Sequence, residues 1–194
     1  MINLYFKQYC SELIATINNL TSKDLTTIVT ILWDAYKGNK KIYVIGNGGS
    51  AATASHYVCD FAKGTAVPGE KRLKIMSLTD NVAHMTAISN DISYNEVFKE
   101  QLENLLEPGD ILICISASGN SPNLVQAVNY ANSINVTTIG ILGFNGGRVK
   151  ELTTTNIVVD NFNYGQVEDI HLMLGHVLSQ YFRKLIVTER EISG

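Results

Sequence analysis

Two pairs of residues in this 194-residue sequence have the types and spacing needed for acid–base or metal chemistry. His56 and Asp60 are four positions apart, so they share one face of a helix. Glu168 and His176 are eight positions apart, near one face of a second helix, with His171 between them. Three interpretations remain open: histidines satisfied by a carboxylate, a divalent metal site, or an acid–base pair. Three of the four histidines lie on these two segments, which favours the second and third.

A glycine-rich segment, GNGGSAA, precedes the first of these helices. Its glycines allow a tight turn, and Ser50 then lies at a helix N-terminus, where free N–H groups favour an anion. Asn47, Gly48 and Ser50 are therefore predicted to contact a substrate. The segment matches neither G-x-G-x-x-G nor G-x-x-x-x-G-K-[ST], so it does not indicate a nucleotide site.

A second segment, SASGNSPN, presents the hydroxyls of Ser116, Ser118 and Ser121, and Pro122 suits a first helical position. Hydroxyls and backbone amides together can bind a phosphate without a lysine. Segments of this composition also form ordinary turns and caps. Two of them after interior strands favour a phosphate site.

A parallel sheet is the element that must position these segments. Short apolar runs separated by helical stretches predict α/β architecture, a three-layer α/β/α sandwich with a central parallel sheet. Ligands bind beyond the carboxyl ends of such strands, where both segments lie. The sequence does not give the strand order. The runs are Ile42–Ile45, Leu73–Leu78, Ile111–Ile115, Thr137–Leu142 and Asn156–Val159.

The whole chain, residues 1–194, is expected to be one domain. Residues 1–38 are predicted to form N-terminal helices, the second beginning at a Thr21-Ser22 cap and ending at Gly38. The last helix is predicted over about Val167 to Ile186, and residues 187–194 are expected to be a loose tail.

The composition excludes several classes of protein. The net charge of −3 provides no basic field for nucleic acid, and no apolar run approaches the ~18 residues of a membrane span. Three dispersed cysteines, Cys10, Cys59 and Cys114, fit a reducing cytosol better than a disulfide framework. We therefore expect a cytoplasmic protein with a small-molecule substrate, no nucleic acid and no membrane.

Four motifs in order, GNGGSAA, DNVAHMTAISND, ISASGNSPN and EDIHLMLGH, resemble the sugar isomerase (SIS) family, and within it the phosphoheptose isomerase group. The resemblance extends to about Leu185. It implies the flavodoxin-like SIS fold, with N-terminal helices packing outside the core. It also implies conversion of sedoheptulose 7-phosphate, or a related sugar phosphate, to the aldoheptose 7-phosphate through an enediol, for surface polysaccharide precursors.

The resemblance also implies roles for particular residues. Ser116, Ser118 and Ser121, helped by Ser50, would hold the phosphate, and Asp91 would line the sugar pocket. The counterparts of Asp60 and His176 are assigned the proton transfers. Four subunits assemble in the family, with active sites between them. The counterparts that bind zinc in the family are those of His56, Asp60, Glu168 and His176.

The sequence departs from the family at several of these positions. Asp60 stands where the family has a longer glutamate, and Glu168 stands where it has glutamine. The second carboxylate makes manganese or iron as plausible as zinc, and Glu168 is an alternative base if Asp60 ligates the metal. Ala117 replaces a threonine, and Gln166 an arginine. These changes lie mostly at the sugar end, so we expect a conserved phosphate site with an altered sugar site.

Two other functions fit the same family. One is a non-catalytic SIS protein that senses a phosphosugar or binds another protein; the presence of Asp60, His171 and His176 favours an enzyme instead. The other is a different SIS enzyme, such as an amino-sugar isomerase. The first glycine segment and the single small domain favour the heptose group, although a fold alone does not give function.

Overall fold

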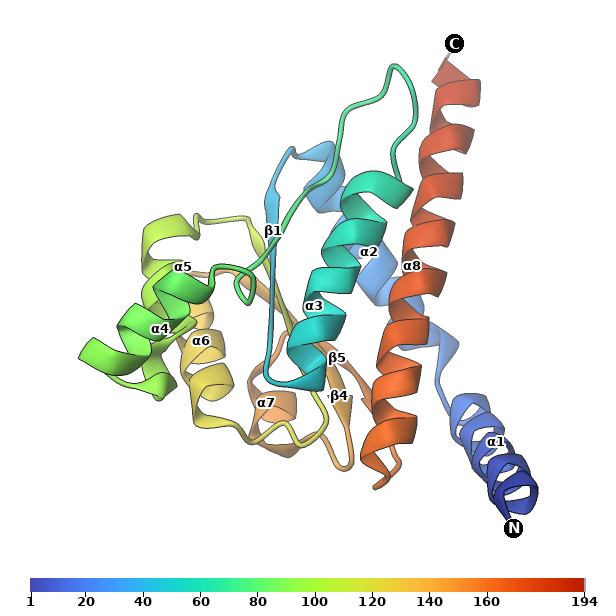
Figure 1. Ribbon diagram of the computed structural model, residues 1–194. Coiled ribbons are helices and arrows are strands. Elements are labelled where there is room, and N and C mark those ends of the chain that lie inside the picture. Colours follow the sequence, from blue (N-terminus) through green and yellow to red (C-terminus); the bar gives the residue numbers. More distant parts are fainter. Residues whose placement is uncertain (194) are drawn as a thin grey trace.

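The computed structural model describes residues 1–193, and these contain a single five-stranded parallel sheet in the order β2-β1-β3-β4-β5 (Figure 1). The five strands predicted from the sequence are confirmed. They are β1 (Lys41–Gly46), β2 (Lys74–Ser77), β3 (Ile111–Ser116), β4 (Thr137–Gly143) and β5 (Thr155–Val159).

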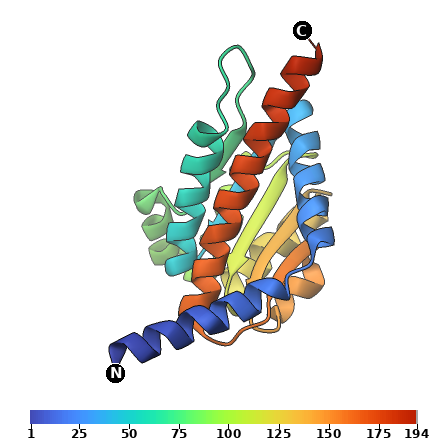
Figure 2. The ribbon, with the colours of Figure 1, turned by 90° about the vertical axis from the view of Figure 1, so that its right-hand side faces the viewer.

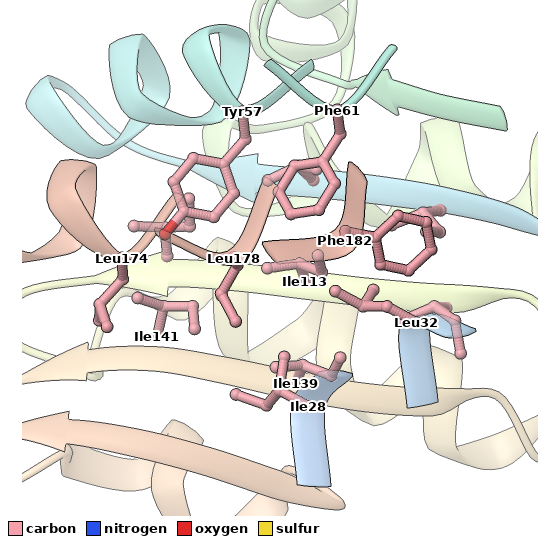
Figure 3. Packing of buried hydrophobic residues seen from close by; sticks show 14 of the residues in the cluster. Ile28, Leu32, Tyr57, Phe61, Ile113, Ile139, Ile141, Leu174, Leu178 and Phe182 are labelled. Carbon is pink, nitrogen blue, oxygen red and sulfur yellow. The ribbon is translucent and has the colours of Figure 1, made fainter. Parts of the chain in front are cut away.

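Helices cover both faces of the sheet because alternate strand residues are apolar on each side. Ile113 and Ile115 belong to one buried cluster, and Leu112 and Cys114 to the other. Figure 3 shows the first cluster, where rings from the helices lie over isoleucines of the strands. Full burial of one such side chain stabilises the fold by about 1.5–3 kcal/mol. The predicted three-layer α/β/α sandwich is confirmed.

The first face is covered by α2 (Ser22–Lys37), α3 (Gly49–Cys59), a π-helical turn η1 (Asp60–Gly64) and α8 (Tyr164–Ser193). The second face is covered by α4 (Val82–Asp91), α5 (Lys99–Leu105), α6 (Pro122–Ser133) and α7 (Gly147–Leu152). A short 3₁₀ turn, η2 (Tyr94–Glu96), links α4 to α5. No helix within residues 1–193 is long and apolar enough to cross a membrane.

Helix α1 (Ile2–Asn18) lies outside these layers and crosses the foot of α8, with its N-terminus pointing away from the core (Figure 2). Polar contacts attach it there. The hydroxyl of Tyr9 donates to Asp169 Oδ2 at 2.6 Å, and Gln166 Nε2 donates to Glu12 Oε2 at 2.9 Å. Several large apolar side chains of α1 remain exposed: Ile2, Leu4, Tyr5, Phe6 and Ile14.

The C-terminal prediction needs correction. Helix α8 runs from Tyr164 to Ser193, so residues 187–193, expected as a loose tail, are helical. Val187 packs against the core cluster, and Arg190 Nη1 donates to the Pro68 carbonyl at 3.1 Å, so packing continues past Ile186. Gly194 lies outside the described residues.

The strand order creates a crevice at one edge of the sheet. From β1 the chain crosses to β2 on one side, whereas β3 pairs with the other side of β1. Such a reversal leaves an opening beyond the carboxyl ends of β1 and β3. The two glycine- and serine-rich loops follow these two strands and therefore face each other there.

Candidate functional site

Two imidazoles meet where α3 and α8 pack together. His56 Nε2 and His176 Nε2 lie 2.9 Å apart, although the two residues are 120 positions apart in the sequence. Their rings are edge-to-face, with centroids 5.0 Å apart. If both of these nitrogens are unprotonated, no hydrogen bond can join them. The short distance therefore suits a proton or a cation that the two nitrogens share.

Asp60, the first residue of η1, completes this group. Its Oδ2 atom lies 3.6 Å from His56 Nε2 and 3.5 Å from His176 Nε2. That oxygen is buried and has no hydrogen-bond partner within residues 1–193. A buried carboxylate oxygen normally has one. The three ligand atoms, one from each side chain, all lie within 4.8 Å of one another.

The close approach of α3 to α8 depends on Gly175. A Cβ at this position would lie 2.3 Å from the ring of Tyr57. Tyr57 is buried, and its hydroxyl donates to the His171 carbonyl at 2.7 Å. Because Tyr57 follows His56 and Gly175 precedes His176, this contact sets how closely the two imidazoles can approach.

The three side chains fit a divalent metal. Two neutral imidazole nitrogens and one carboxylate oxygen are a common catalytic zinc set, which leaves a fourth position open, and they also suit iron. The unpartnered Asp60 oxygen is the observation that favours a cation here over a simple ion pair. Three of the four predicted metal ligands, His56, Asp60 and His176, are thus together.

Glu168 is not a member of this group. Its carboxylate lies against Gly49, where a Cβ would be 2.4 Å from Glu168 Oε1. Gly49 begins α3, and the partial positive charge of a helix N-terminus attracts a carboxylate. Glu168 therefore occupies the end of α3 at which the sequence suggested an anion site, about two helical turns from His176 on α8.

The second loop retains the features of an anion cradle. Ser116 Oγ accepts from the Gly119 amide at 3.0 Å, and Ser118 Oγ accepts from the Asn120 amide at 3.3 Å. Ser121 is the N-cap of α6 but makes no side-chain cap, and Pro122 follows it at the first position. Pro122 has no N–H, and the Leu124 amide donates to Asn123 Oδ1 at 2.9 Å, so the Asn123 amide and the Ser121 hydroxyl are the groups available here to a phosphate.

This loop is fixed from behind by the turn after β4. Gly119 has φ of +63°, and a Cβ there would lie 1.9 Å from the Gly146 carbonyl oxygen. The Val149 amide donates to the Gly119 carbonyl at 2.9 Å, and the Arg148 amide donates to Asn120 Oδ1 at 3.0 Å. Only glycine fits the left-handed conformation in so little space.

Asn47 connects the two loops. Its side-chain amide exchanges two hydrogen bonds of 2.9 Å with that of Asn123 in α6. Tyr94 of η2 donates its hydroxyl to Asn47 Oδ1 at 2.9 Å. Sequence reasoning missed Tyr94 and Asn123, because pairing across 47 and 76 positions leaves no local pattern.

The other predicted substrate residues differ in position. Gly48 has φ of +55° and open space where a Cβ would point, whereas Ser50 is buried in the first turn of α3. Asp91 is exposed at the end of α4, where Asn90 Nδ2 donates to it at 2.8 Å. Asp80 accepts a hydrogen bond from Ser55 of α3. Nothing in the described contacts places Asp91 against the two loops.

His171 is separate from the triad. Its ring is fully buried, and neither ring nitrogen has a hydrogen-bond partner within residues 1–193. Burial lowers the pKa of His171 to about 4, against a smaller opposite effect of the Leu142 backbone. It is a neutral core residue at neutral pH.

Comparison with protein families identifies the architecture. The model of the SIS domain matches residues 5–143. A phosphoheptose isomerase of Clostridium acetobutylicum is 37% identical over 168 residues, covering 87% of this chain and 85% of the relative. One of Nitratiruptor sp. is 39% identical over 152 residues, covering 78% of this chain and 81% of the relative.

Solved structures agree with these relatives. A phosphoheptose isomerase from Francisella tularensis superimposes with a TM-score of 0.85 at 25% identity, covering 94% of this chain and 96% of its own. The enzyme from Neisseria gonorrhoeae gives 0.87 at 24% identity, covering 95% and 100%. At that identity the second likeness shows the fold alone.

Proposed function

Because the chain belongs to the SIS domain family and is a phosphosugar isomerase, we propose that it converts sedoheptulose 7-phosphate, or a closely related ketose phosphate, to the corresponding aldose phosphate. The relatives named phosphoheptose isomerase at 37% and 39% identity support the heptose substrate. The single observation that carries the proposal is the His56–Asp60–His176 triad, in a chain whose serine loop has the features of a phosphate cradle. The product would supply surface polysaccharide precursors.

We propose that His56, Asp60 and His176 hold a divalent metal, zinc by resemblance, and that Asp60, through its second oxygen, also supplies the base. A metal bound there would polarise the substrate oxygens and stabilise the enediolate. Glu168 lies against Gly49 at the start of α3, about two helical turns from His176, which is too far to act on the same two carbons. This assignment selects one of the two alternatives that the sequence left open.

The chemistry is a transfer of protons with no external oxidant. Asp60 takes a proton from C1 of the ketose while the C2 oxygen gains one, which gives the enediol. The O1 hydroxyl then loses its proton, C1 becomes the carbonyl carbon, and Asp60 returns a proton to C2. We assign the transfer between the two oxygens to His176, whose side chain is 43% exposed, against 23% for Asp60.

We place the phosphate on Ser116, Ser118 and Ser121 at the start of α6. The carboxylate of Glu168 already lies at the start of α3 and would repel a phosphate there. The Asn47–Asn123 pair ties the first loop to α6, so a substrate held by its phosphate would extend along Asn47 and Gly48 toward the triad. Asp91 remains a proposed contact of the sugar hydroxyls.

We also propose a homotetramer in the cytoplasm. An apolar groove of about 510 Å³ between α2 and α8 supports the oligomer, and Val177, which follows His176, lines it. A second copy seated there would cover one side of the triad. The three free cysteines support a reducing compartment.

The test is turnover of sedoheptulose 7-phosphate by protein of measured metal content, with two substitutions. Glu168→Gln is expected to keep both the metal and the incorporation of solvent deuterium at C2. Asp60→Asn is expected to lose the metal and turnover together. Asp169→Asn, an exposed carboxylate on the same helix, is the control and should behave as the parent.

Three results would contradict the proposed function. If the metal-loaded parent turned over none of a panel of ketose phosphates, the isomerase proposal would be wrong. If Asp60→Asn kept full deuterium incorporation, Asp60 would not be the base. If Glu168→Gln lost that incorporation while keeping the metal, Glu168 would be the base instead.

A further inference from the structure

The turn that carries Asp60 is unusual. Helix α3 ends at Cys59, and residues Asp60–Gly64 continue as a π-helical turn, η1. A π turn is wider than an α turn, because each amide reaches back five residues instead of four. Such turns are rare and frequently occur at functional sites. Asp60 keeps helical angles, with φ of −67° and ψ of −45°. Its amide also still donates to the His56 carbonyl, so Asp60 is the residue at which the α-helix passes into the π turn.

In the widened turn, a side-chain hydroxyl donates to the Phe61 carbonyl in place of a backbone amide. In a regular α-helix the Thr65 amide would donate to the Phe61 carbonyl. Here the Thr65 amide is directed to the Lys63 carbonyl instead, and the Thr65 hydroxyl donates to the Phe61 carbonyl at 2.5 Å. Thr65 is 2% exposed, so water cannot replace this donor. A buried carbonyl without a partner would cost about 1–3 kcal/mol.

Phe61 fixes the other side of the same peptide. It is 1% exposed, and its ring contacts those of Tyr57 and Phe182, with centroids 6.1 and 6.3 Å away. Figure 3 shows the rings of Tyr57 and Phe61 side by side in the core. Asp60 therefore lies between the end of α3 and a residue whose ring and carbonyl are both anchored.

We infer that Thr65 is a positioning residue, which holds the π turn and thereby keeps the short carboxylate of Asp60 between His56 and His176. The inference rests on the proposed metal site. Because Phe61 is anchored in the core, a turn that tightened to regular α geometry would displace the end of α3, and Asp60 Oδ2 would leave its places 3.5 and 3.6 Å from the two imidazoles. An aspartate has little length with which to compensate, so its backbone must be placed accurately.

The experiment compares Thr65→Val, which has nearly the same shape but no hydroxyl, with Thr65→Ser, which keeps the hydroxyl. Thr16→Val is the control. Thr16 is also buried and its hydroxyl donates to a carbonyl four residues back, at Glu12, and in addition accepts from Asn161 Nδ2. Zn²⁺ and Mn²⁺ dissociation constants of the full chain are measured by chelator competition. Amide hydrogen exchange of residues 60–66 and crystal structures are obtained on the metal-free proteins.

We expect Thr65→Val to weaken metal binding more than tenfold and to speed exchange in residues 60–66, while Thr65→Ser stays within threefold of the parent. Thr16→Val should lose about as much thermal stability as Thr65→Val but leave metal affinity unchanged. Equal metal affinity for Thr65→Val and the parent would overturn the inference, as would an equal loss in Thr65→Ser or in Thr16→Val.

The metal-free measurements separate this inference from the proposed function. If the parent bound no metal, the proposed metal role would be wrong. The crystal structures would still decide the role of Thr65, since Thr65→Val must move Asp60 Oδ2 away from the imidazoles and Thr65→Ser must not. An unchanged Asp60 position in Thr65→Val would contradict the inference by itself.

Discussion

The protonation of a buried side chain depends on whether it has hydrogen-bond partners in the core. His171 is the clearest example, because its ring is fully buried and both nitrogens are unpartnered. Its spacing from Glu168 and His176 suggested a role in the site, but it lies on the face of α8 that packs into the core. A periodic sequence pattern gives the helix and cannot give which of several histidines turns inward.

Acid should destabilise the protein through His171. Its folded pKa of about 4 is below the ordinary 6.5, so the unfolded chain binds the proton more readily. The contribution of neutral His171 to the free energy of unfolding is therefore fully present above pH 6.5 and is lost progressively toward pH 4. It amounts to about 3 kcal/mol. Urea unfolding across this range measures it. His171→Leu should flatten the dependence; an equally steep loss in that variant would assign it to other groups.

The hydroxyl of Tyr94 should matter for substrate binding more than for the chemical step. Tyr94→Phe removes one hydrogen bond to Asn47, worth about 0.5–1.5 kcal/mol. We expect KM for the sugar phosphate to rise up to about tenfold while kcat stays within twofold. Tyr130→Phe in α6 is the control. A fall in kcat with unchanged KM would show that Tyr94 acts in the reaction instead.

At the scale of elements, the site depends on how two helices pack. His56 and His176 meet because α3 and α8 approach closely at Gly175, which leaves room for the Tyr57 ring. The sequence predicted both helices and the shared face of His56 and Asp60. It could not predict that contact, nor the π turn after Cys59, because both depend on packing between distant segments.

Gly175→Ala should force the two helices apart. The added methyl would overlap the Tyr57 ring, and overpacking of this kind typically costs 1–3 kcal/mol. We expect that loss in urea unfolding, together with weaker metal binding as the imidazoles separate. Gly165→Ala, at the start of the same helix, is the control, because the nearest atom to its Cβ would be the Tyr9 hydroxyl at 3.1 Å. Unchanged stability in Gly175→Ala would mean that the helices can shift freely.

For the whole molecule, the sequence predicted much of the fold and less of the site. Apolar runs located all five strands, and the Thr21 and Gly38 caps located α2, because these signals are local. The strand order, the helical residues 187–193 and the place of Glu168 were not predicted, because each depends on contacts between remote parts of the chain. The groove between α2 and α8 is likewise a property of the assembled surface.

The groove predicts where two copies meet. Tyr181 lines it and is 51% exposed, so Tyr181→Glu should fold normally and yet introduce a charge at the apolar contact. Light scattering should show the parent as a tetramer and Tyr181→Glu as a smaller species. Gln180→Glu adds the same charge at the neighbouring exposed position and should keep the parent's mass. Equal masses for all three proteins would place the interface elsewhere.

The 120 positions between His56 and His176 have a consequence for how the protein is made. A ribosome adds about 5–20 residues per second, so the first imidazole leaves it roughly 6–24 seconds before the second. During that interval the nascent chain carries His56 and Asp60 without their partner from α8. Any metal captured then would have two protein ligands in place of three, so stable loading must follow the synthesis of α8.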